Sequence, residues 1–496
     1  MTRPSTLQEL RARHGPRYRW LLLLAVMVGA MAAIMSSTII NVAVPDMSRH
    51  FTLGQERAQW VSSGFMVAMT VAMLTTPWLL GAFGYRRTYV ATMLLMLAGG
   101  VAGGLANDYP LVLAARVAEG LAAGVVQPIP AIIILRAFEP HEQGRASGIF
   151  GMGVVLAPAL GPSIGGVLVD WFGWRSIFFM VVPLCLAALA LAYRYVPSTA
   201  PGGVAPGSQR APLDWAGLLL ATLGTLALLN GLVQWHAGAS AAAALLLGAA
   251  AALTLAFWWR ARRLGTGGAG SGRPAALLNL TLFAHRPFAM GSIVAFIYGM
   301  ALFGSTYLIP VFMQIGLGLS ASYVGTILLP AGVVLAATIA AAGRLADRYP
   351  AHWLVSAGVA LLAASFALMA LVHSGQAIAL LITLAIVGRI GLGCILPALN
   401  LGAMRGLPPA LIPQGASAIN FVRMLGGAVG VSLCGIVLEW RLAAHGASLH
   451  DASGGAQRLA AFDEVFVLLG GLCALALGAA WRLRERLSPA PPAARP

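Results

Sequence analysis

Two ionisable residues, Arg116 and Glu119, stand three positions apart inside an apolar segment that reads RVAEGLAAG. If this segment is helical, both side chains lie on the same face, one turn apart. Ionisable groups within a membrane are costly and usually serve a function. A carboxyl in such surroundings can take up and release a proton, so Glu119 and Arg116 are candidates for proton coupling. The alternative is a permanent ion pair that only holds helices together.

Several other side chains inside apolar segments could line an internal cavity. Two of them are methionines one helical turn apart, and flexible, polarisable methionine suits surfaces that accept varied apolar ligands. Ordinary packing is the alternative for the methionines, and helix-to-helix hydrogen bonding or pairing is the alternative for the polar residues. The cavity candidates are Met31, Met35, Ser36, Asn41, Gln127, Arg389, Asn420 and Arg423.

The composition indicates an integral membrane protein. The chain of 496 residues is 59% hydrophobic and only 9% charged, which is far less charge than soluble globular proteins carry. A helix needs about 20 apolar residues to cross the hydrocarbon core, and the alternating pattern of a membrane barrel is absent. The sequence predicts an all-α fold with fourteen spans, at 20–44, 58–80, 88–106, 110–135, 147–169, 176–196, 215–235, 238–259, 287–313, 322–342, 353–373, 377–400, 414–438 and 463–482.

The arginines indicate the orientation of these spans. If the N-terminus is cytoplasmic, most arginines fall in inner loops and tails, as the positive-inside rule requires. We therefore expect both termini in the cytoplasm. The net charge of +16 then reflects membrane topology and does not indicate nucleic acid. The arginines left in outer loops are Arg49, Arg57, Arg175, Arg441 and Arg458.

The spans fall into groups of six, two and six. We expect a six-helix bundle over 1–197, a linker segment with two additional spans over 198–286, and a second six-helix bundle with a cytoplasmic tail over 287–496. The two additional spans are nearly devoid of polar residues. They should therefore form a peripheral hairpin that faces lipid.

The fifth predicted span contains an unusual density of glycine and proline, in the sequence GMGVVLAPALGPSIGG. Proline removes a backbone donor and bends a helix, and glycine allows a neighbouring backbone to approach closely. Such a span is suited to be a moving part of a transporter. The predicted hinge residues are Gly151, Pro158, Gly161, Pro162, Gly165 and Gly166.

Two loops suggest an internal repeat. The loop after the second span reads PWLLGAFGYRR and the loop after the tenth reads GRLADRYPAHW. Aligned, they place Gly81 opposite Asp347, so Asp347 and Arg348 form the intact copy of a predicted conformational-switch loop. Two related halves imply a binding site near the midplane, exposed alternately to either side by rocking.

Some activities are excluded by residue types. The chain has no lysine, so it cannot contain the phosphate-binding loop of an ATPase. The cysteines at 185, 394, 434 and 473 all lie in predicted spans without paired spacing, which favours packing over a metal site or disulfides. We expect no enzymatic activity, no cofactor and no bound metal.

Several of these segments resemble a known family. STIINVAVP, RVAEGLAAG, APALGPSIGG, WRSIFFMVVP, DWAG, GRLADR and NFVRMLGGAVG are similar to motifs of the fourteen-helix drug:proton antiporters of the major facilitator superfamily, the EmrB/QacA type. The resemblance covers nearly the whole chain. It implies a bacterial inner-membrane exporter of lipophilic or amphipathic toxic compounds, driven by proton exchange. In Gram-negative cells it also implies a periplasmic adaptor and an outer-membrane channel.

The sequence departs from that family at the residues most relevant to coupling. The family usually has aspartate where Ser36 and Gly81 stand, and glutamine where Glu119 stands. We therefore hypothesise that Glu119 replaces the missing carboxylate as proton carrier. The alternative is an exporter of one narrow substrate class, such as a siderophore, amino acid or fatty acid, without proton coupling. A scaffold or receptor that transports nothing is a third interpretation, which the hinge motif disfavours.

Overall fold

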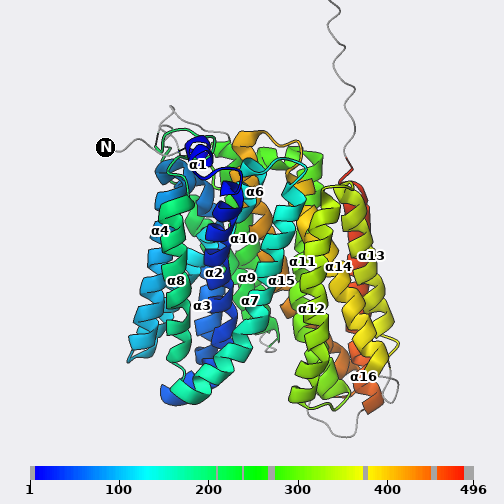
Figure 1. The fold of residues 1–496 in the computed structure, drawn as a ribbon. Coiled ribbons are helices and arrows are strands. Elements are labelled where there is room, and N and C mark those ends of the chain that lie inside the picture. Colours follow the sequence, from blue (N-terminus) through cyan, green and yellow to red (C-terminus); the bar gives the residue numbers. More distant parts are fainter. Residues whose placement is uncertain are drawn as a thin grey trace, which may run out of the picture.

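The computed structural model describes residues 6–207, 211–236, 240–265, 274–372, 378–447 and 455–484. In these residues the chain forms helices, most of them joined by short connections, with a longer non-helical segment between α8 and α9 (Figure 1). The elements are α1 (Leu7–His14), α2 (Tyr18–His50), α3 (Gln55–Ala72), η1 (Met73–Thr75), α4 (Thr76–Leu105), α5 (Tyr109–Val126), α6 (Ile129–Ala137), α7 (Gln143–Phe172), α8 (Ser176–Tyr195), α9 (Trp215–His236), α10 (Ser240–Leu264), η2 (Leu280–Ala284), α11 (Arg286–Val311), η3 (Phe312–Gly316), α12 (Ala321–Ala346), α13 (Ala351–Met369), α14 (Ile378–Met404), η4 (Pro409–Leu411), α15 (Ile412–Ala444) and α16 (Gly455–Trp481).

The helical class agrees with the sequence, but the number of candidate spans differs. Among the described residues, 12 segments are long and apolar enough to cross a membrane, whereas the sequence predicts fourteen. The difference has two sources. The predicted spans 58–80 and 88–106 fall within one continuous candidate, Trp60–Leu105, and α7, which contains the predicted span 147–169, is not one of the 12.

The chain reverses direction within α4. Gly84 has φ +79, which is not helical, and helical segments lie on both sides of it. The hydroxyl of Thr88 donates to the carbonyl oxygen of Leu79 at 3.0 Å. In a continuous helix nine residues span about 13 Å, so this bond requires a turn. Glycine suits the position because other residues rarely adopt a positive φ.

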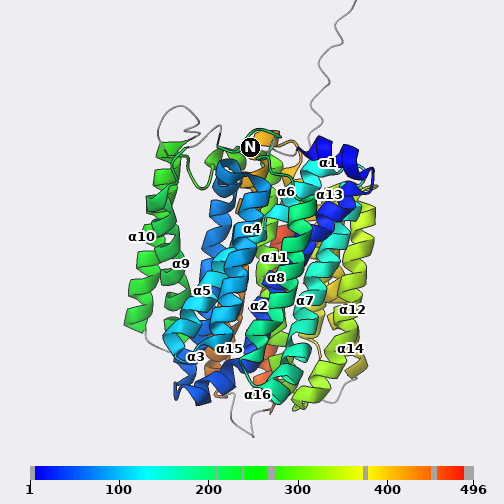
Figure 2. The same ribbon diagram turned by 60° about the vertical axis from the view of Figure 1, so that its left-hand side comes forward.

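The helices pack as two groups with a separate pair at one edge. The first half comprises α2 to α8, and the second half comprises α11 to α16. They meet mainly along α7 and α12. Helices α9 and α10 pack on one another at the periphery, where Figure 2 shows them beside the bundle, and α9 touches both α3 and α15.

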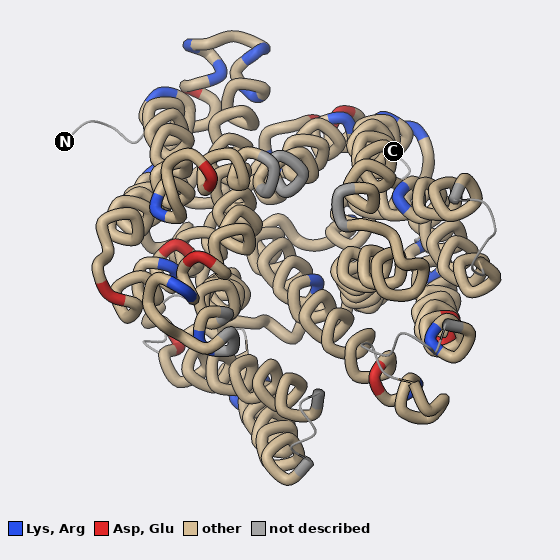
Figure 3. The backbone as a smooth tube through the Cα atoms, turned by 90° about the horizontal axis from the view of Figure 1, so that it is seen from below, with Lys and Arg blue, Asp and Glu red and all other residues tan. Residues whose placement is uncertain are grey.

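The two halves are closed against each other at one end, the end that carries α1, here called the α1 end. There a Cβ at Gly343 of α12 would lie 2.5 Å from the carbonyl oxygen of Gly144 and from the Cα of Gly148, both on α7. Figure 1 shows α7 and α12 converging toward the α1 end and separating toward the opposite end. Viewed along the bundle, charged residues are sparse among the helices (Figure 3).

Candidate functional site

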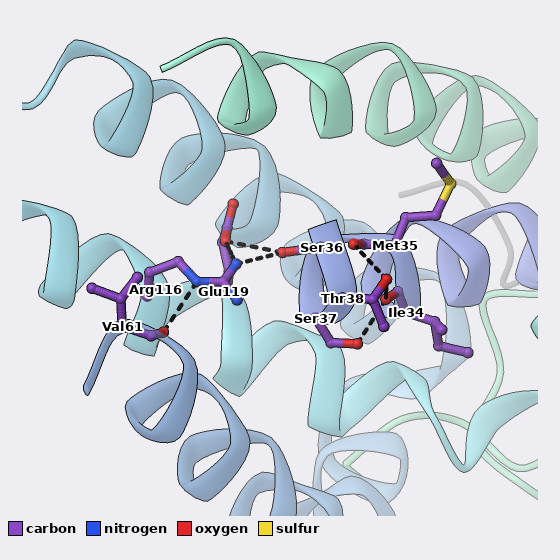
Figure 4. A network of polar contacts seen from close by, with 8 residues as sticks. All are labelled: Ile34, Met35, Ser36, Ser37, Thr38, Val61, Arg116 and Glu119. Carbon is purple, nitrogen blue, oxygen red and sulfur yellow. Dashed lines mark hydrogen bonds and ion pairs between the residues drawn. The ribbon is translucent and has the colours of Figure 1, made fainter. Parts of the chain in front are cut away.

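The clearest polar site joins α2 to α5 through three side chains, Ser36, Arg116 and Glu119, here called the polar triad. One guanidinium nitrogen of Arg116, Nη1, donates to Glu119 Oε2 at 2.5 Å and to Ser36 Oγ at 2.7 Å. The Ser36 hydroxyl in turn donates to Glu119 Oε2 at 3.0 Å. Figure 4 shows these three side chains pointing toward one another across the two helices. The predicted pairing of Arg116 with Glu119 is therefore present.

Helix α5 holds this pair at a defined depth. Asp108 caps its first turn by accepting from the backbone N–H of Leu111 at 2.8 Å, and a proline follows in the first turn, where its missing N–H costs nothing. From that fixed start, Glu119 lies about 15 Å along the helix, near its middle. The position is thus set by a cap signal that the sequence contains.

The polar triad is sealed from its surroundings. The side chains of Arg116 and Glu119 have relative exposures of 2% and 1%. Arg116 also donates from Nε to the carbonyl oxygen of Val61 at 3.3 Å, and its guanidinium lies 4.2 Å from the centre of the Phe65 ring on α3. A charge in this position is stabilised by its partners and by the aromatic face.

The polar triad is nevertheless not fully satisfied within the protein. Glu119 Oε1 and Arg116 Nη2 are buried and lack a hydrogen-bond partner in the structure. Buried polar atoms are usually bonded, and an exception calls for an explanation such as a catalytic or ion-handling role. One carboxylate oxygen is therefore held by two donors while the other is free to accept.

Two glycines of α4 make room for this carboxylate, and the sequence analysis did not identify them. A Cβ at Gly99 would lie 2.7 Å from Glu119 Cγ, and a Cβ at Gly100 would lie 3.5 Å from Glu119 Oε1. The paired glycines in an otherwise apolar span were the signal that could have identified them. They allow α4 to pack directly over the carboxylate.

The remaining candidates in the first half do not join the polar triad. Met31 and Met35 lie in an apolar cluster with Ala157 of α7 and Met180 of α8. Asn41 is exposed and accepts a hydrogen bond from the Ser62 hydroxyl at 3.0 Å. Met31 and Met35 thus pack among residues of α7 and α8, and Asn41 joins α2 to α3.

Gln127 lies where α5 ends. Its backbone N–H donates to the carbonyl oxygen of Ala123 at 3.1 Å, and the next residue, Pro128, precedes α6. It is therefore placed at the junction of two helical segments, at the end nearer the α1 end.

The second half brings together the other polar candidates on three helices. Arg423 Nη2 on α15 donates to Asn420 Oδ1 at 2.6 Å, and Asn420 Nδ2 donates to the carbonyl oxygen of Ala416 at 2.8 Å. The phenol of Tyr298 on α11 lies within electrostatic range of both Arg423 and Arg389, which is on α14. Tyr298 was not among the predicted residues, because a tyrosine in an apolar span is common in packing.

The predicted hinge motif lies in α7, and its glycines contact two different helices. A Cβ at Gly151 would lie 2.7 Å from Ile339 on α12 of the second half. Cβ atoms at Gly161 and Gly165 would lie 2.7 Å and 2.5 Å from Thr38 and Ile39 on α2. Gly166 has open space around it. The backbone of α7 includes Pro158 and Pro162, but their side chains lie outside the described residues.

Asp347 bridges the two halves at the α1 end. Its Oδ1 accepts the backbone N–H of Gly144 at 2.6 Å, and its Oδ2 accepts that of Arg145 at 2.8 Å. These N–H groups belong to the first turn of α7, where a helix favours an anion. Burial raises the pKa of the Asp347 carboxyl, and the two N–H bonds offset only part of that effect. Arg348 is exposed at the surface.

The corresponding loop of the first half is held differently. Gly81 has no side chain to bridge the halves, and its carbonyl oxygen accepts the N–H of Gly207 at 3.1 Å. The N–H groups of Tyr85 and Arg86 donate to the carbonyl oxygens of Thr199 and Pro197, both at 3.0 Å. The segment after α8 therefore packs against this turn. Across the halves, Arg136 donates to the carbonyl oxygen of Pro409.

Known proteins are similar to this chain in sequence or in fold. The protein described as "Multidrug resistance protein B homolog" of Mycobacterium tuberculosis is 29% identical over 427 residues, 84% of this chain and 76% of that protein. "Riboflavin transporter RibZ" of Clostridioides difficile is 24% identical over 421 residues, 84% of this chain and 87% of its own. The solved structure of the proton:xylose symporter XylE matches with a TM-score of 0.66 at 15% identity, covering 94% of this chain and 96% of that one. That likeness concerns the fold alone.

A model of the Major Facilitator Superfamily matches residues 26–431, which is most of the chain. The two halves, the long apolar helices and the close α7–α12 contact agree with that match. The protein is a small-molecule transporter of the membrane, and it belongs to the Major Facilitator Superfamily.

Proposed function

We propose that this transporter exports lipophilic or amphipathic toxic compounds in exchange for protons, and that Glu119 carries the proton. The observation that supports this most directly is the geometry of the polar triad. Glu119 Oε2 receives two donors while Oε1 has none. A buried carboxylate with one unbonded oxygen is suited to bind a proton there, and Arg116 stabilises the deprotonated form.

The polar triad also couples two helices to the protonation state. In the deprotonated state the Ser36 hydroxyl of α2 donates to Glu119 and accepts from Arg116, both on α5, so the two helices are held together. Protonation removes the negative charge and weakens the bond from Ser36 to Glu119, since charge-assisted hydrogen bonds are the stronger ones. Uptake and release of a proton would then bias the packing of these helices, which is what coupling requires.

Rocking of the two halves supplies the transport step in this proposal. Contact across the α1 end through Asp347 and Gly343 supports a state closed at that end. The arginine distribution supports a cytoplasmic α1 end, with both termini there. We further propose fourteen crossings of the bacterial inner membrane. The reversal at Gly84 and the 30-residue length of α7 support that number.

A transport assay in proteoliposomes tests this proposal. The full chain is reconstituted, a pH gradient is applied, and movement of ethidium and of N-phenyl-1-naphthylamine is followed by fluorescence. Glu119→Gln should abolish the response to the gradient while dye binding persists. Glu139→Gln, a change at a half-exposed carboxylate, is the matched control. Undiminished gradient-driven transport in Glu119→Gln would refute the role of Glu119.

Export of one narrow substrate class is the second candidate. The similarity to a riboflavin transporter favours it, because that protein is named for a single compound. This gene can be expressed in a strain that lacks its own exporters. If it restores resistance to several unrelated dyes and antiseptics, broad specificity is favoured.

A tripartite assembly with a periplasmic adaptor and an outer-membrane channel belongs to the same proposal. It is supported only by the resemblance to the EmrB/QacA type. Co-purification of an adaptor protein with the detergent-solubilised transporter would support that assembly, and export that is complete without one would contradict it.

A further inference from the structure

The second half contains two arginines in the middle of the bundle whose charge the described part of the chain leaves uncompensated. They are Arg389 on α14 and Arg423 on α15, here called the cation pair. At about 1.5 Å per residue they lie about 22 Å and 16 Å along their helices from the α1 end. Both depths fall well inside a hydrocarbon core of about 30 Å. A charge at this depth is costly and usually functional.

Neither member of the cation pair has a carboxylate partner among the described residues. Arg423 is bonded to the neutral amide of Asn420, and Arg389 makes no ion pair in that part of the chain. By contrast, Arg116 of the first half is paired with Glu119 at 2.5 Å. Tyr298, which lies near both guanidinium groups, supplies only a neutral phenol. The described centre of the second half therefore carries two positive charges and no negative one.

The face of α14 that carries Arg389 packs against α12 and, nearer the α1 end, against α7 of the first half. Gly393 and Leu396 lie four and seven residues after Arg389, on the same helical face. A Cβ at Gly393 would lie 2.8 Å from Thr338 on α12, and Leu396 lies near Gly151 of α7 in the first half. Arg389 therefore lies on the face of α14 that contacts α12 and, about 10 Å closer to the α1 end at Leu396, reaches α7 of the first half.

The guanidinium groups are also accessible. Both arginines are partly exposed, and their nitrogens are not among the buried atoms that lack a partner, unlike Arg116 Nη2. A structural arginine that bonds helices together would be expected to use its donors on backbone carbonyls or carboxylates. Arg389 uses none within the described chain, so its five N–H donors remain available to a ligand.

We propose that the cation pair is an anion subsite, and that the transported compounds are amphipathic anions carrying a carboxylate, sulfonate or phosphate. Guanidinium groups bind such oxyanions in a bidentate manner. The apolar body of the compound would then contact the aromatic and aliphatic residues between the halves. This inference depends on the proposed export function only for calling the bound anion a substrate.

Thermal unfolding of the purified full chain with matched probes tests the anion subsite. Naphthalene-1-sulfonate is compared with naphthalene-1-sulfonamide, and octanoate with octanamide, with sodium chloride at equal ionic strength as reference. At least one organic anion should raise the Tm, whereas its amide and chloride should not. In Arg389→Gln and Arg423→Gln the affinity of that anion should fall about tenfold or more. Arg389→Lys should keep part of the response, and Arg13→Gln, at an exposed arginine of α1, should keep all of it.

The unliganded proteins give a second readout that separates a binding role from a structural one. If Arg389 mainly holds helices together, Arg389→Gln lowers the Tm without ligand. If it forms an anion subsite, removing its uncompensated charge leaves that Tm unchanged or higher. Equal effects of anion and amide, no effect of either anion, or a shift reproduced by chloride would each refute the proposal.

The proposed export function is tested separately, by transport. It is refuted if no compound of a mixed panel moves in response to a pH gradient, whatever effect the anions have on the Tm. If cationic and neutral dyes are transported in response to the gradient but the anions leave the Tm unchanged, proton-driven export is supported and the anion subsite is refuted.

Discussion

The substitution Gly343→Ala should open the α1 end of the transporter. A Cβ at residue 343 would lie 2.5 Å from the carbonyl oxygen of Gly144 and from the Cα of Gly148. Carbon contacts are most favourable at about 3.5–4.0 Å, so α7 and α12 must separate by roughly 1 Å. Both opposing atoms belong to the backbone and cannot rotate away. Overpacking of this kind costs about 1–3 kcal/mol, which shifts an equilibrium between closed and open states by about 5-fold to 150-fold.

Distance measurement by pulsed electron spin resonance checks this expectation. One spin label replaces His141, whose side chain is 71% exposed beside α7, and the other replaces Tyr349, which is 57% exposed just after α12. The native cysteines are first replaced by alanine, and they are Cys185, Cys394, Cys434 and Cys473. The parent should show mainly the short distance of the closed state. Gly343→Ala should add a longer distance that becomes substantial or dominant.

The same helix offers a matched control for this experiment. Gly332 of α12 has no atom within 4 Å of the position that a Cβ would occupy. Gly332→Ala therefore changes helix propensity by the same amount without a clash, and it should leave the distances unchanged. The reasoning is refuted if Gly343→Ala and Gly332→Ala give the same distance distribution.

Three further substitutions have defined expectations. Asp347→Asn removes the charge that accepts two N–H groups of α7, so it should weaken closure by about 1.5–3 kcal/mol and increase the long distance between the same spin labels. Ser36→Ala deletes the buried hydroxyl of the polar triad and should lower the free energy of unfolding by about 1–3 kcal/mol, seen as a lower Tm; an unchanged Tm would mean that the hydroxyl contributes nothing. Gly99→Ala places a Cβ 2.7 Å from Glu119 Cγ and should reduce gradient-driven transport, whereas Gly471→Ala, which has open space around it, should not.

The residues that sequence analysis located best are those related by helix geometry. Arg116 and Glu119 are three residues apart, and any helix places such residues on one face, so their ion pair followed once the segment was helical. Long apolar segments likewise predicted long helices, because each has to bury its backbone polar groups within itself. The apolar pattern does not by itself divide these segments into spans, since α3 and α4 form one apolar stretch that reverses at a single glycine.

Contacts between helices could not be predicted in the same way. That Ser36 joins Arg116 depends on the crossing of α2 and α5, which no local spacing encodes. The same holds for Tyr298, which only the packing of α11 against α14 and α15 brings near two arginines. The replacement of aspartate by Gly81 was visible in the sequence, but the segment that packs there instead comes from beyond α8.

The chain that leads into the α9–α10 hairpin is bonded to the first half at several points. Besides the bonds at Gly81, Tyr85 and Arg86, the indole N–H of Trp78 donates to the carbonyl oxygen of Ala211 at 2.9 Å. The start of the hairpin is thus fixed to the lobe that contains α3 and α4. Its contact with α15 includes an apolar cluster to which Leu220 and Phe421 belong. When the two halves tilt, the α9–α10 hairpin should move with the first half. The apolar surface of α15 should then slide along the hairpin.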